Sequence, residues 1–470
     1  MVAELFVAGR FERTPLTAEI RAPWDHSLIA EVSLAHEHTV ERAIEHARNA
    51  VAPLRSMPTH ARRALLAAIA DGLREKSETF ATLIAREAAK PIALARAEVR
   101  RAESTFRLAS EECARLGGEA LALDLNPGLD GLVGAWTRVG SGALLAITPF
   151  NFPLNLVAHK LAPAFALAMP VVLKPAPQTP LTALALASLV AEAGAPAGLL
   201  SVIPTSNELA ARMVEDERFA AVSFTGSAQV GWAIKSRAGK KRALLELGGN
   251  AAAIVAPDAD ALAAIERIFS PAFAYAGQVC IKTQRVFVPR TQYQAFVDAI
   301  VARTRALEVR DPLDEAALMG PLIDRRAAER VRSWIDEAVA KGASLLCGGA
   351  LTDNRLTPAI VIDAAEGTQL VDEELFGPAL IVHGYDDLSH AIASIERGRY
   401  GLQTALFTND TRTIRRCFHE LTTGALIVNE GTNFRVDSMP YGGVKDSGLG
   451  REGVRFAIDE LSDKKLLVVR

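Results

Sequence analysis

The sequence has few cysteines, and they lie far apart. Four occur in 470 residues, at Cys113, Cys280, Cys347 and Cys417, and no two of them form a C-x-x-C pair. This spacing gives neither a zinc-ligand pattern nor a disulfide framework. We therefore expect no metal site, and a reducing compartment, the cytoplasm.

Long apolar runs and blocks of one charge are also missing. No run reaches the roughly 20 apolar residues of a membrane-spanning helix, because prolines and polar residues interrupt even the apolar stretch 142–175. The N-terminal MVAELFVAGRFER lacks the apolar core of a signal peptide. With 52 Lys and Arg, 55 Asp and Glu and a net charge of −3, no basic surface for nucleic acid stands out. We expect neither membranes nor nucleic acids as partners.

What the sequence does contain is an alternation of apolar runs and helical patterns. Apolar runs lie at 143–148, 171–175, 199–204, 221–226 and 243–249, and a second block extends from 252 to 430. This β-α-β rhythm predicts an α/β fold with parallel sheets covered by helices. Such sheets bind ligands at the carboxyl ends of their strands. Residues 117–136 are rich in turn residues and predict a hairpin-like arm.

The stretch AGQVCIKTQR contains a candidate nucleophile. Cys280 follows Gly277 and Gln278 and precedes a polar run, 282–285, which predicts a loop or a helix start. A helix N-terminus or nearby cations lower the pKa of a thiol and favour the thiolate. A lone cysteine is more often an inert small residue. Cys280 is therefore a candidate nucleophile only if other parts of the sequence supply further catalytic groups.

Two other stretches supply such companions. In LLELGGN, Glu246 is either the salt-bridge partner of Lys240 or Lys241 or a partly buried general base. In TPFNFP, Asn151 either caps a helix that starts at Pro153 or donates its amide to an oxyanion. A thiol, a carboxylate and a carboxamide together can carry out covalent acyl chemistry.

A nucleotide site is indicated more weakly. The fingerprint G-x-G-x-x-G is absent after the first strand of the series, but SFTGSAQVGWAI places Gly226 and Gly231 between a strand and a helix. Such a turn can hold a pyrophosphate at the helix N-terminus. Lys174, at the end of another strand, can hold a ribose hydroxyl or a phosphate. Glu374, in EELFGP, can hold a ribose.

Taken together, these stretches resemble a known family. TPFNFP, VVLKPAPQTP, SFTGSAQVG, LELGGN, GQVC, EELFGP and PYGGVKDSGLGREG are similar, in order and over essentially the whole chain, to the motifs of the aldehyde dehydrogenase superfamily. The 34 residues from Glu246 to Cys280 match its spacing. The resemblance implies a Rossmann-like NAD(P)-binding domain (1–116 and 137–250), an α/β catalytic domain (251–430) and a β oligomerisation arm (117–136 and 455–470).

The resemblance also implies roles for single residues. Cys280 is similar to the catalytic nucleophile, Glu246 to the general base and Asn151 to the oxyanion donor. The implied cofactor is NAD or NADP, with Lys174 and Glu374 at its two riboses. The implied cofactor contacts are, in chain order, Thr148, Pro149, Phe150, Lys174, Pro177, Gly226, Ser227, Leu247, Gly248, Glu374 and Phe376.

One position departs from the family pattern. Many NAD-preferring members carry an acidic residue where this chain has Pro177. A carboxylate there repels the 2′-phosphate of NADP, and proline does not. The choice between NAD and NADP is therefore open.

Two segments bear on the substrate. ITPFNFPLNLVAHKLAPA and FRVDSMPYGGVKDSGLGREG most resemble the lactaldehyde dehydrogenase-like group, which includes enzymes for phosphonate- or sulfonate-bearing aldehydes. We therefore expect a small hydroxylated or anionic aldehyde. Arg101, Arg107 and His159 either present cations to an anionic substrate or have structural roles. In the second case the two arginines are surface charges and His159 is a packing residue. Phe434 and Arg435 are expected at the substrate mouth.

The sequence alone leaves alternative functions open. Val279, where the non-phosphorylating glyceraldehyde-3-phosphate type has an arginine, disfavours that type. A CoA-acylating enzyme is an alternative, although Glu246 favours hydrolysis, and so is a non-catalytic structural protein with the same fold. The arm and the closing strand LLVV predict a homodimer or homotetramer, in which that strand pairs with the arm of a neighbouring subunit.

Overall fold

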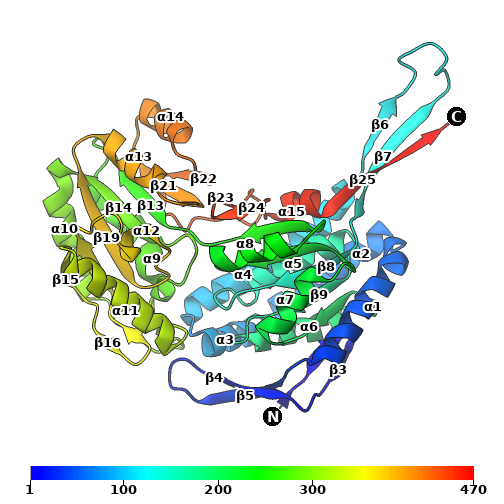
Figure 1. Ribbon diagram of the computed structural model, residues 1–470, viewed down its shortest axis with the longest axis horizontal. Helices are drawn as coiled ribbons and strands as arrows, with labels where there is room; N and C mark the ends of the chain where they lie inside the picture. The colour runs from blue at the N-terminus through cyan, green and yellow to red at the C-terminus, as the bar shows by residue number, and fades with distance from the viewer. Residues whose placement is uncertain (1) are drawn as a thin grey trace.

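The computed structural model describes residues 2–470 and shows two α/β bodies beside each other, with a narrow β arm that projects from the first body (Figure 1). The first body is built on an eight-stranded sheet and the second on a seven-stranded sheet. Both sheets are mainly parallel, as the alternating apolar runs predict. Within residues 2–470, no helix combines the length and the apolar character needed to cross a bilayer.

The eight-stranded sheet has the order β24-β12-β11-β8-β9-β10-β2-β3. The five strands from β12 to β10 in this order are parallel, whereas β24, β2 and β3 pair antiparallel with their neighbours. The strands are β2 (Leu5–Val7), β3 (Arg10–Glu12), β8 (Ala143–Ile147), β9 (Val171–Lys174), β10 (Leu200–Val202), β11 (Phe219–Thr225), β12 (Arg242–Glu246) and β24 (Gly448–Leu449).

Helices cover both faces of this sheet, so its central strands are apolar throughout. Leu144 and Ala146 of β8 face one core, and Leu145 and Ile147 face the other, as the alternation of side chains along a strand requires. The first core packs α2 (Thr59–Glu75), α3 (Ser77–Ala88), α4 (Ile92–Glu112), α5 (Asn155–Ala166), α6 (Pro180–Glu192) and α15 (Val454–Leu461). The second packs α1 (Glu37–Arg55), α7 (Asn207–Glu215) and α8 (Ala228–Arg237).

The seven-stranded sheet has the order β15-β18-β19-β14-β13-β21-β22 and is parallel except for β15. Its strands are β13 (Ala251–Val255), β14 (Thr283–Pro289), β15 (Ser344–Cys347), β18 (Ala359–Ile362), β19 (Ala379–Tyr385), β21 (Gln403–Phe407) and β22 (Ala425–Val428). One face packs against α9 (Ala261–Phe273) and α10 (Arg290–Arg305). The other packs against α11 (Arg325–Ala340), α12 (Gln369–Asp372), α13 (Leu388–Glu396) and α14 (Thr411–Glu420).

Side-chain caps fix where several of these helices begin. The carboxylate of Asp260 accepts the backbone N–H groups of Leu262 and Ala263 at the start of α9. Asp410 caps α14 in the same way. Because the first N–H groups of a helix have no partner within it, each such cap stabilises the helix by about 1 kcal/mol.

The remaining elements are short. They are β1 (Val2–Ala3), β4 (Thr17–Arg21), β5 (Leu28–Ser33), β16 (Leu351–Thr352), β17 (Arg355–Leu356), β20 (Tyr400–Gly401), β23 (Val444–Lys445) and the 3₁₀ turns η1 (Cys113–Arg115) and η2 (Ala274–Gly277). β1, β5 and β4 form a small sheet beneath the first body.

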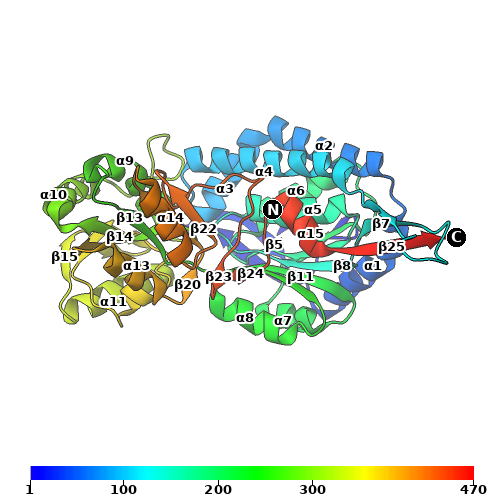
Figure 2. The ribbon, with the colours of Figure 1, turned by 90° about the horizontal axis from the view of Figure 1, so that it is seen from above.

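The arm projects from the first body in the view from above as well (Figure 2). It is a three-stranded antiparallel sheet in the order β25-β7-β6. Its strands are β6 (Glu119–Ala122), β7 (Val133–Gly140) and β25 (Ser462–Val469). The closing strand β25 pairs with β7 of its own chain, from Ser462 opposite Gly140 to Val469 opposite Val133. Because β25 is an outer strand of this sheet, the expectation that it also pairs with the arm of a neighbouring subunit stays a prediction.

Candidate functional site

The register of the first sheet brings four strand ends to one edge. β8 pairs with β9 and with β11, and β11 pairs with β12, so that the four strands end together at residues 147, 174, 225 and 246. These are the carboxyl ends of parallel strands, where α/β sheets bind ligands. The segments that follow carry the predicted site residues Asn151, Gly226 and Gly248, and Glu246 itself ends β12.

Cys280 comes from the second sheet. It lies in the turn before β14, whose first residue, Thr283, pairs with Ala251 at the start of β13. A Cβ atom at Gly249 would lie 2.4 Å from the Cys280 carbonyl oxygen. Only glycine fits where the two segments cross, and the crossing brings Cys280 to the strand ends of the first sheet.

The backbone before Cys280 makes a sharp turn. Tyr275, Ala276 and Gly277 have φ values of 56°, 52° and 67°, in the left-handed region that costs a non-glycine residue about 1–2 kcal/mol. The Tyr275 hydroxyl donates to the Ala88 carbonyl at 2.9 Å and holds the turn in place. Of the two expected settings, the structure shows the loop, since no helix begins at Cys280.

The Cys280 thiol has two kinds of neighbour. Burial, with smaller contributions from the negative charges of Glu374 and Glu246, raises its pKa to about 11. A hydrogen bond with Tyr441 and the charge of Arg435 act in the opposite direction. The Sγ atom lies 3.1 Å from the Tyr441 hydroxyl oxygen.

Asn151 points its amide at the loop that carries Cys280. Its Nδ2 donates to the backbone carbonyl of Gln278 at 2.9 Å, and the residue is 4% exposed. It does not cap a helix, because α5 begins at Asn155 without a side-chain cap rather than at Pro153. A carboxamide has two N–H donors, so one remains for an oxygen atom bound at Cys280.

Glu246 is buried and forms no ion pair among the described residues. No ion pair joins it to Lys240 or Lys241 among the described residues, and Lys241 donates to backbone carbonyls instead. Within residues 2–470, its Oε2 atom has no hydrogen-bond partner. Burial raises the pKa of Glu246 well above the usual carboxyl range, and the charge of Glu452 adds to this. These are properties of a general base.

A buried ion cluster lies beside Glu246. Glu452 binds Lys160 through Oε1 at 3.3 Å and Arg435 through Oε2 at 3.1 Å. Burial alone would raise the pKa of Glu452, but the charges of Lys160 and Arg435 hold it well below the usual range. Glu452 therefore stays ionised, and Glu246 is the carboxyl group that can take up a proton.

Two cavities meet at Cys280. One has a volume of about 780 Å³ and is lined by residues of both α/β bodies. The other has a volume of about 180 Å³. Both are lined by Cys280 and Leu156. The thiol thus stands between a space for a large ligand and a space for a small one.

Eight of the eleven residues predicted to contact the cofactor line the larger cavity, namely Pro149, Phe150, Gly226, Ser227, Leu247, Gly248, Glu374 and Phe376. Ser227 caps α8 by accepting the Val230 N–H at 3.4 Å, and Gly226 precedes this cap residue. Free N–H groups and the helix dipole make such a position favourable for an anion.

A carboxylate and two aromatic rings form another part of this wall. The Glu374 carboxylate accepts the Gly249 N–H at 3.1 Å, and a Cβ at Gly248 would lie 2.3 Å from its Oε2. Burial raises the pKa of Glu374 to about 7. The rings of Phe150 and Phe376 meet edge to face, with centroids 6.0 Å apart.

Three predicted cofactor residues lie outside the cavity lining. The Thr148 N–H donates to the Lys174 carbonyl at 3.2 Å, across the neighbouring strand ends. The Lys174 ammonium donates to Asn207 at 3.0 Å, and burial lowers its pKa to about 8. Pro177 is exposed in the turn after β9.

The substrate candidates divide into two groups. Arg101 and Arg435 line the smaller cavity, whereas His159 and Phe434 do not. Arg101 pairs with Asp437 at 2.7 Å, and the same carboxylate binds Nε2 of the buried His159 at 2.9 Å. Phe434 is 44% exposed.

The sequence reasoning missed several residues of this site, among them Tyr441, Asp437, Glu452 and Lys160. A signal existed for Lys160, because a lysine within the apolar run NLVAHKLAPA needs a buried partner. Tyr441 stands in a motif that served only for the family resemblance. Glu452 and Asp437 carry no local signal, since their partners come from distant segments.

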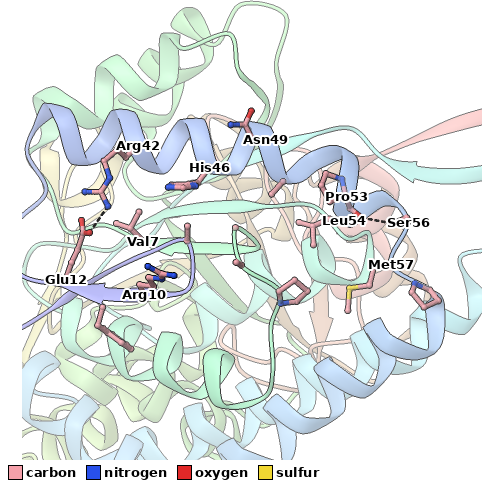
Figure 3. A pocket seen from close by; sticks show the side chains of 17 residues that line it. Val7, Arg10, Glu12, Arg42, His46, Asn49, Pro53, Leu54, Ser56 and Met57 are labelled. Atoms are coloured by element: carbon pink, nitrogen blue, oxygen red, sulfur yellow. Dashed lines mark hydrogen bonds and ion pairs between the residues drawn. The ribbon is translucent and has the colours of Figure 1, made fainter.

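A third cavity, of about 880 Å³, lies between α1 and the hairpin of β2 and β3 (Figure 3). Its residues Arg42 and Glu12 bind each other at 2.7 Å. No cysteine and no predicted site residue lines it. The reactive groups therefore belong to the two cavities at Cys280.

Comparisons with known proteins show to which family the chain belongs. A 3-sulfolactaldehyde dehydrogenase from Priestia aryabhattai is 39% identical over 466 residues, which cover 99% of this chain and 97% of that protein. A lactaldehyde dehydrogenase from Methanococcus aeolicus is 32% identical over 456 residues, which cover 96% of this chain and 97% of that protein.

Among solved structures, the NADP-dependent glyceraldehyde-3-phosphate dehydrogenase from Bacillus halodurans complexed with NADP superposes with a TM-score of 0.97 at 33% identity, over 100% of this chain and 99% of that chain. The predicted fold class and family resemblance are thereby confirmed. With a model of the Aldehyde dehydrogenase family matching residues 12–467, the chain belongs to that family.

Proposed function

We propose that this chain oxidises a small, hydroxylated or anionic aldehyde to the carboxylic acid with NAD or NADP, through a covalent adduct on Cys280. One observation carries the proposal. Cys280 stands where the two cavities meet. The Asn151 amide donates to the Gln278 carbonyl in the Cys280 loop, and the unpaired Glu246 carboxylate lies in the wall of the larger cavity. A nucleophile, an oxyanion donor and a general base are the groups that this reaction needs.

The first half of the reaction uses the thiol and the amide. The Cys280 thiolate attacks the aldehyde carbon, its electron pair forms the C–S bond, and the carbonyl π pair moves onto oxygen. The Asn151 amide and the Cys280 backbone N–H donate to this oxyanion, and one such donor stabilises the transition state by about 3 kcal/mol. Bound NAD(P)⁺ supplies the hydride acceptor for this carbon, and a thioester remains on Cys280.

The second half uses the carboxylate. Glu246 takes a proton from a water molecule, whose oxygen attacks the thioester carbon. The C–S bond breaks, the sulfur leaves with its electron pair as thiolate, and the carboxylic acid is released. Burial and the neighbouring charge of Glu452 make Glu246 more basic than an ordinary glutamate.

The walls of the larger cavity fit a dinucleotide. Gly226 and Ser227 at the α8 N-terminus suit a pyrophosphate, and Glu374 suits the hydroxyls of a ribose. Lys174 and Pro177 stand at the neighbouring strand end, and Pro177 carries no charge to repel a 2′-phosphate. The Bacillus halodurans relative was solved with NADP, which supports NADP as well as NAD for this chain.

The smaller cavity supports an anionic or hydroxylated substrate. Arg101 and Arg435 both line it, and each already binds one carboxylate. A guanidinium has five N–H donors, so each arginine keeps donors for a sulfonate, carboxylate or hydroxyl. The named substrates of the sulfolactaldehyde and lactaldehyde dehydrogenases that resemble this chain have these groups.

The replacement Arg101→Met tests this assignment. We expect KM to rise at least about tenfold for an anionic aldehyde such as succinate semialdehyde, because a charge-assisted hydrogen bond contributes about 1.5–3 kcal/mol. KM for neutral glycolaldehyde should change less than about threefold. The control is Arg107→Met on the same helix, whose partner is Asp71 at the surface. Equal effects on both aldehydes would contradict an anion site at Arg101.

A substrate panel tests the function as a whole. Purified protein is assayed with lactaldehyde, glycolaldehyde, succinate semialdehyde, 3-sulfolactaldehyde and phosphonoacetaldehyde, each with NAD and with NADP, and with and without CoA. The proposal expects reduced cofactor and free acid in equal amounts without CoA. An acyl-CoA product would indicate the acylating type, and the absence of any cofactor reduction would indicate a structural protein.

The arm supports assembly into a homodimer or homotetramer. Its outer strands β6 and β25 have free edges, and β25 exposes a run of apolar side chains, Leu466, Leu467, Val468 and Val469. Such edges and patches favour association. We also place the protein in the reducing cytoplasm as part of this proposal, because its four cysteines are all unpaired.

Sedimentation of a Leu467→Asp variant tests the assembly. Leu467 is 64% exposed in the middle of the apolar run, and a buried charge there would be costly. We expect the unmodified protein to sediment as a dimer or tetramer at micromolar concentration and the variant as a smaller species. The control Lys465→Gln, on the same strand, should keep the original size. A monomeric unmodified protein would contradict the proposal.

A further inference from the structure

Tyr441 places a phenol against the reactive sulfur. Its hydroxyl oxygen lies 3.1 Å from Sγ of Cys280, within the range accepted for hydrogen bonds to sulfur. The side chain is 4% exposed, so bulk water does not compete for this contact. The smaller cavity is lined by both residues, which puts the contact on the side where the aldehyde is proposed to bind.

The position of the phenol is fixed from two directions. The guanidinium of Arg435 lies over the Tyr441 ring, 3.7 Å from its centroid. The Tyr441 backbone forms an isolated bridge with Glu452, with N–H to carbonyl distances of 3.0 and 2.7 Å. Glu452 also binds Arg435. The Tyr441 ring, the Arg435 guanidinium and the Glu452 backbone therefore fix one another's positions.

The direction of the hydrogen bond follows from the acidities of the two groups. Burial raises the pKa of Tyr441 well above its usual range, and the neighbouring Cys280 adds to this. The pKa of Cys280, raised by burial, reaches about 11. The thiol therefore gives up its proton before the phenol does. A thiolate has no proton to donate, so in the reactive form the phenol O–H donates to sulfur.

We propose that Tyr441 is a further catalytic residue of this chain, whose hydroxyl donates a hydrogen bond to the Cys280 thiolate and so increases the fraction of nucleophile present near neutral pH. This inference rests on the proposed function. When the sulfur attacks the aldehyde carbon, its electron pair enters the C–S bond and its charge is lost. The phenol keeps its proton throughout, so Tyr441 stabilises the nucleophile and transfers nothing.

The charges around the sulfur show why such a donor matters. Glu246 at the end of β12 and Glu374 after α12 both disfavour the thiolate, and Arg435 favours it. With two carboxylates and one guanidinium facing the thiol, the charges alone do not offset its burial. Tyr441 adds a donor in direct contact with sulfur.

The test is the pH dependence of Cys280 alkylation by iodoacetamide, without aldehyde or cofactor. The modified Cys280 peptide is quantified by mass spectrometry, which separates it from the other three cysteines. In Tyr441→Phe we expect the midpoint of the rate profile to move up by about one pH unit, corresponding to about tenfold less thiolate below it. The control Tyr293→Phe removes a half-buried hydroxyl that donates to the Val382 carbonyl and should leave the midpoint unchanged.

A second feature of the same profile separates this role from a structural one. A thiolate that loses a hydrogen bond is more basic and intrinsically more nucleophilic, by about threefold per unit of pKa. Tyr441→Phe should therefore react more slowly than the unmodified protein at neutral pH but at least as fast above both midpoints. A distorted site would react more slowly at every pH.

An unchanged or lowered midpoint in Tyr441→Phe would overturn the proposal. If the phenylalanine variant does not fold, Tyr441→Met also lacks the hydroxyl and takes its place under the same criteria. Because alkylation requires no aldehyde oxidation, its result is independent of the substrate panel. Failure of the proposed function and failure of the Tyr441 assignment can therefore be told apart.

Discussion

Cys280→Ala is expected to abolish aldehyde oxidation, with kcat reduced on the order of 10⁴-fold or more. Every later step of the proposed reaction takes place on the adduct at this sulfur, so no route around its loss remains. The measurement is the initial rate of NAD(P)H formation with the best substrate of the panel. Circular dichroism and thermal unfolding of the variant confirm that the fold is intact.

The control for this variant is Cys347→Ala, which removes a half-buried thiol from β15. Cys347 lines neither cavity at the strand ends, so this variant should keep most of the activity. Retention of substantial oxidation in Cys280→Ala would contradict the assignment of the nucleophile. Equal losses in both variants would point to a general effect of cysteine removal on the protein.

Glu246→Gln is expected to stop the reaction at the thioester. Glutamine fills the same space but cannot take a proton from water, and the loss of a general base lowers a rate by about 10²- to 10⁴-fold. Rapid mixing should show a burst of about one NAD(P)H per chain, followed by slow turnover. The acylated Cys280 peptide should be detectable by mass spectrometry.

The same variant checks the pH dependence of the second half-reaction. The pKa of Glu246 lies above the usual carboxyl range because the residue is buried and faces Glu452. Below that pKa the group is protonated and cannot act as a base, so the deacylation rate of the unmodified protein should rise as pH rises through it. Glu246→Gln should lose this dependence, and Glu266→Gln, a surface carboxylate bound to Arg303, should keep it. Fast steady-state formation of NAD(P)H without an initial burst in Glu246→Gln would contradict the role of Glu246 as general base.

Strand ends were the part of the site most open to prediction. The apolar runs before Asn151, Lys174, Gly226 and Glu246 all form strands of one sheet. Alternating strands and helices are local signals, and the right-handed β-α-β connection leaves few arrangements for them. The sequence thus predicted that these residues lie together at the carboxyl ends of the parallel strands.

The polar run 282–285 shows what local signals miss. It predicted a loop or a helix start around Cys280, yet residues 283–285 begin the fully buried strand β14. Lys282 donates to the Ala379 carbonyl at 2.7 Å, and Gln284 donates to the Glu373 carbonyl at 2.8 Å. Both partners lie about 90 or more residues away, and a buried polar side chain is tolerated because of such partners.

The sequence did not reveal the ion-pair partners of Arg101 and His159 either, because these partners also lie far away in the chain. Asp437 binds both Arg101 and His159 from a loop far along the chain. Neither the arginine nor the histidine carries a local mark of this contact, so the sequence left open whether they face a substrate anion or are, in turn, a surface charge and a packing histidine. In the structure Arg101 lies in the cavity wall, whereas His159 is buried and does not line this cavity.

The origin of the site from two sheets has a consequence for how activity arises during folding. Asn151 and Glu246 belong to the first body and Cys280 to the second, and the bond from Asn151 to the Gln278 carbonyl spans the boundary between them. Neither body alone holds all three of the residues proposed to act in the reaction. Under the proposed mechanism, a chain whose two bodies have folded but not docked lacks the assembled site, so aldehyde oxidation is expected to begin only once the bodies dock.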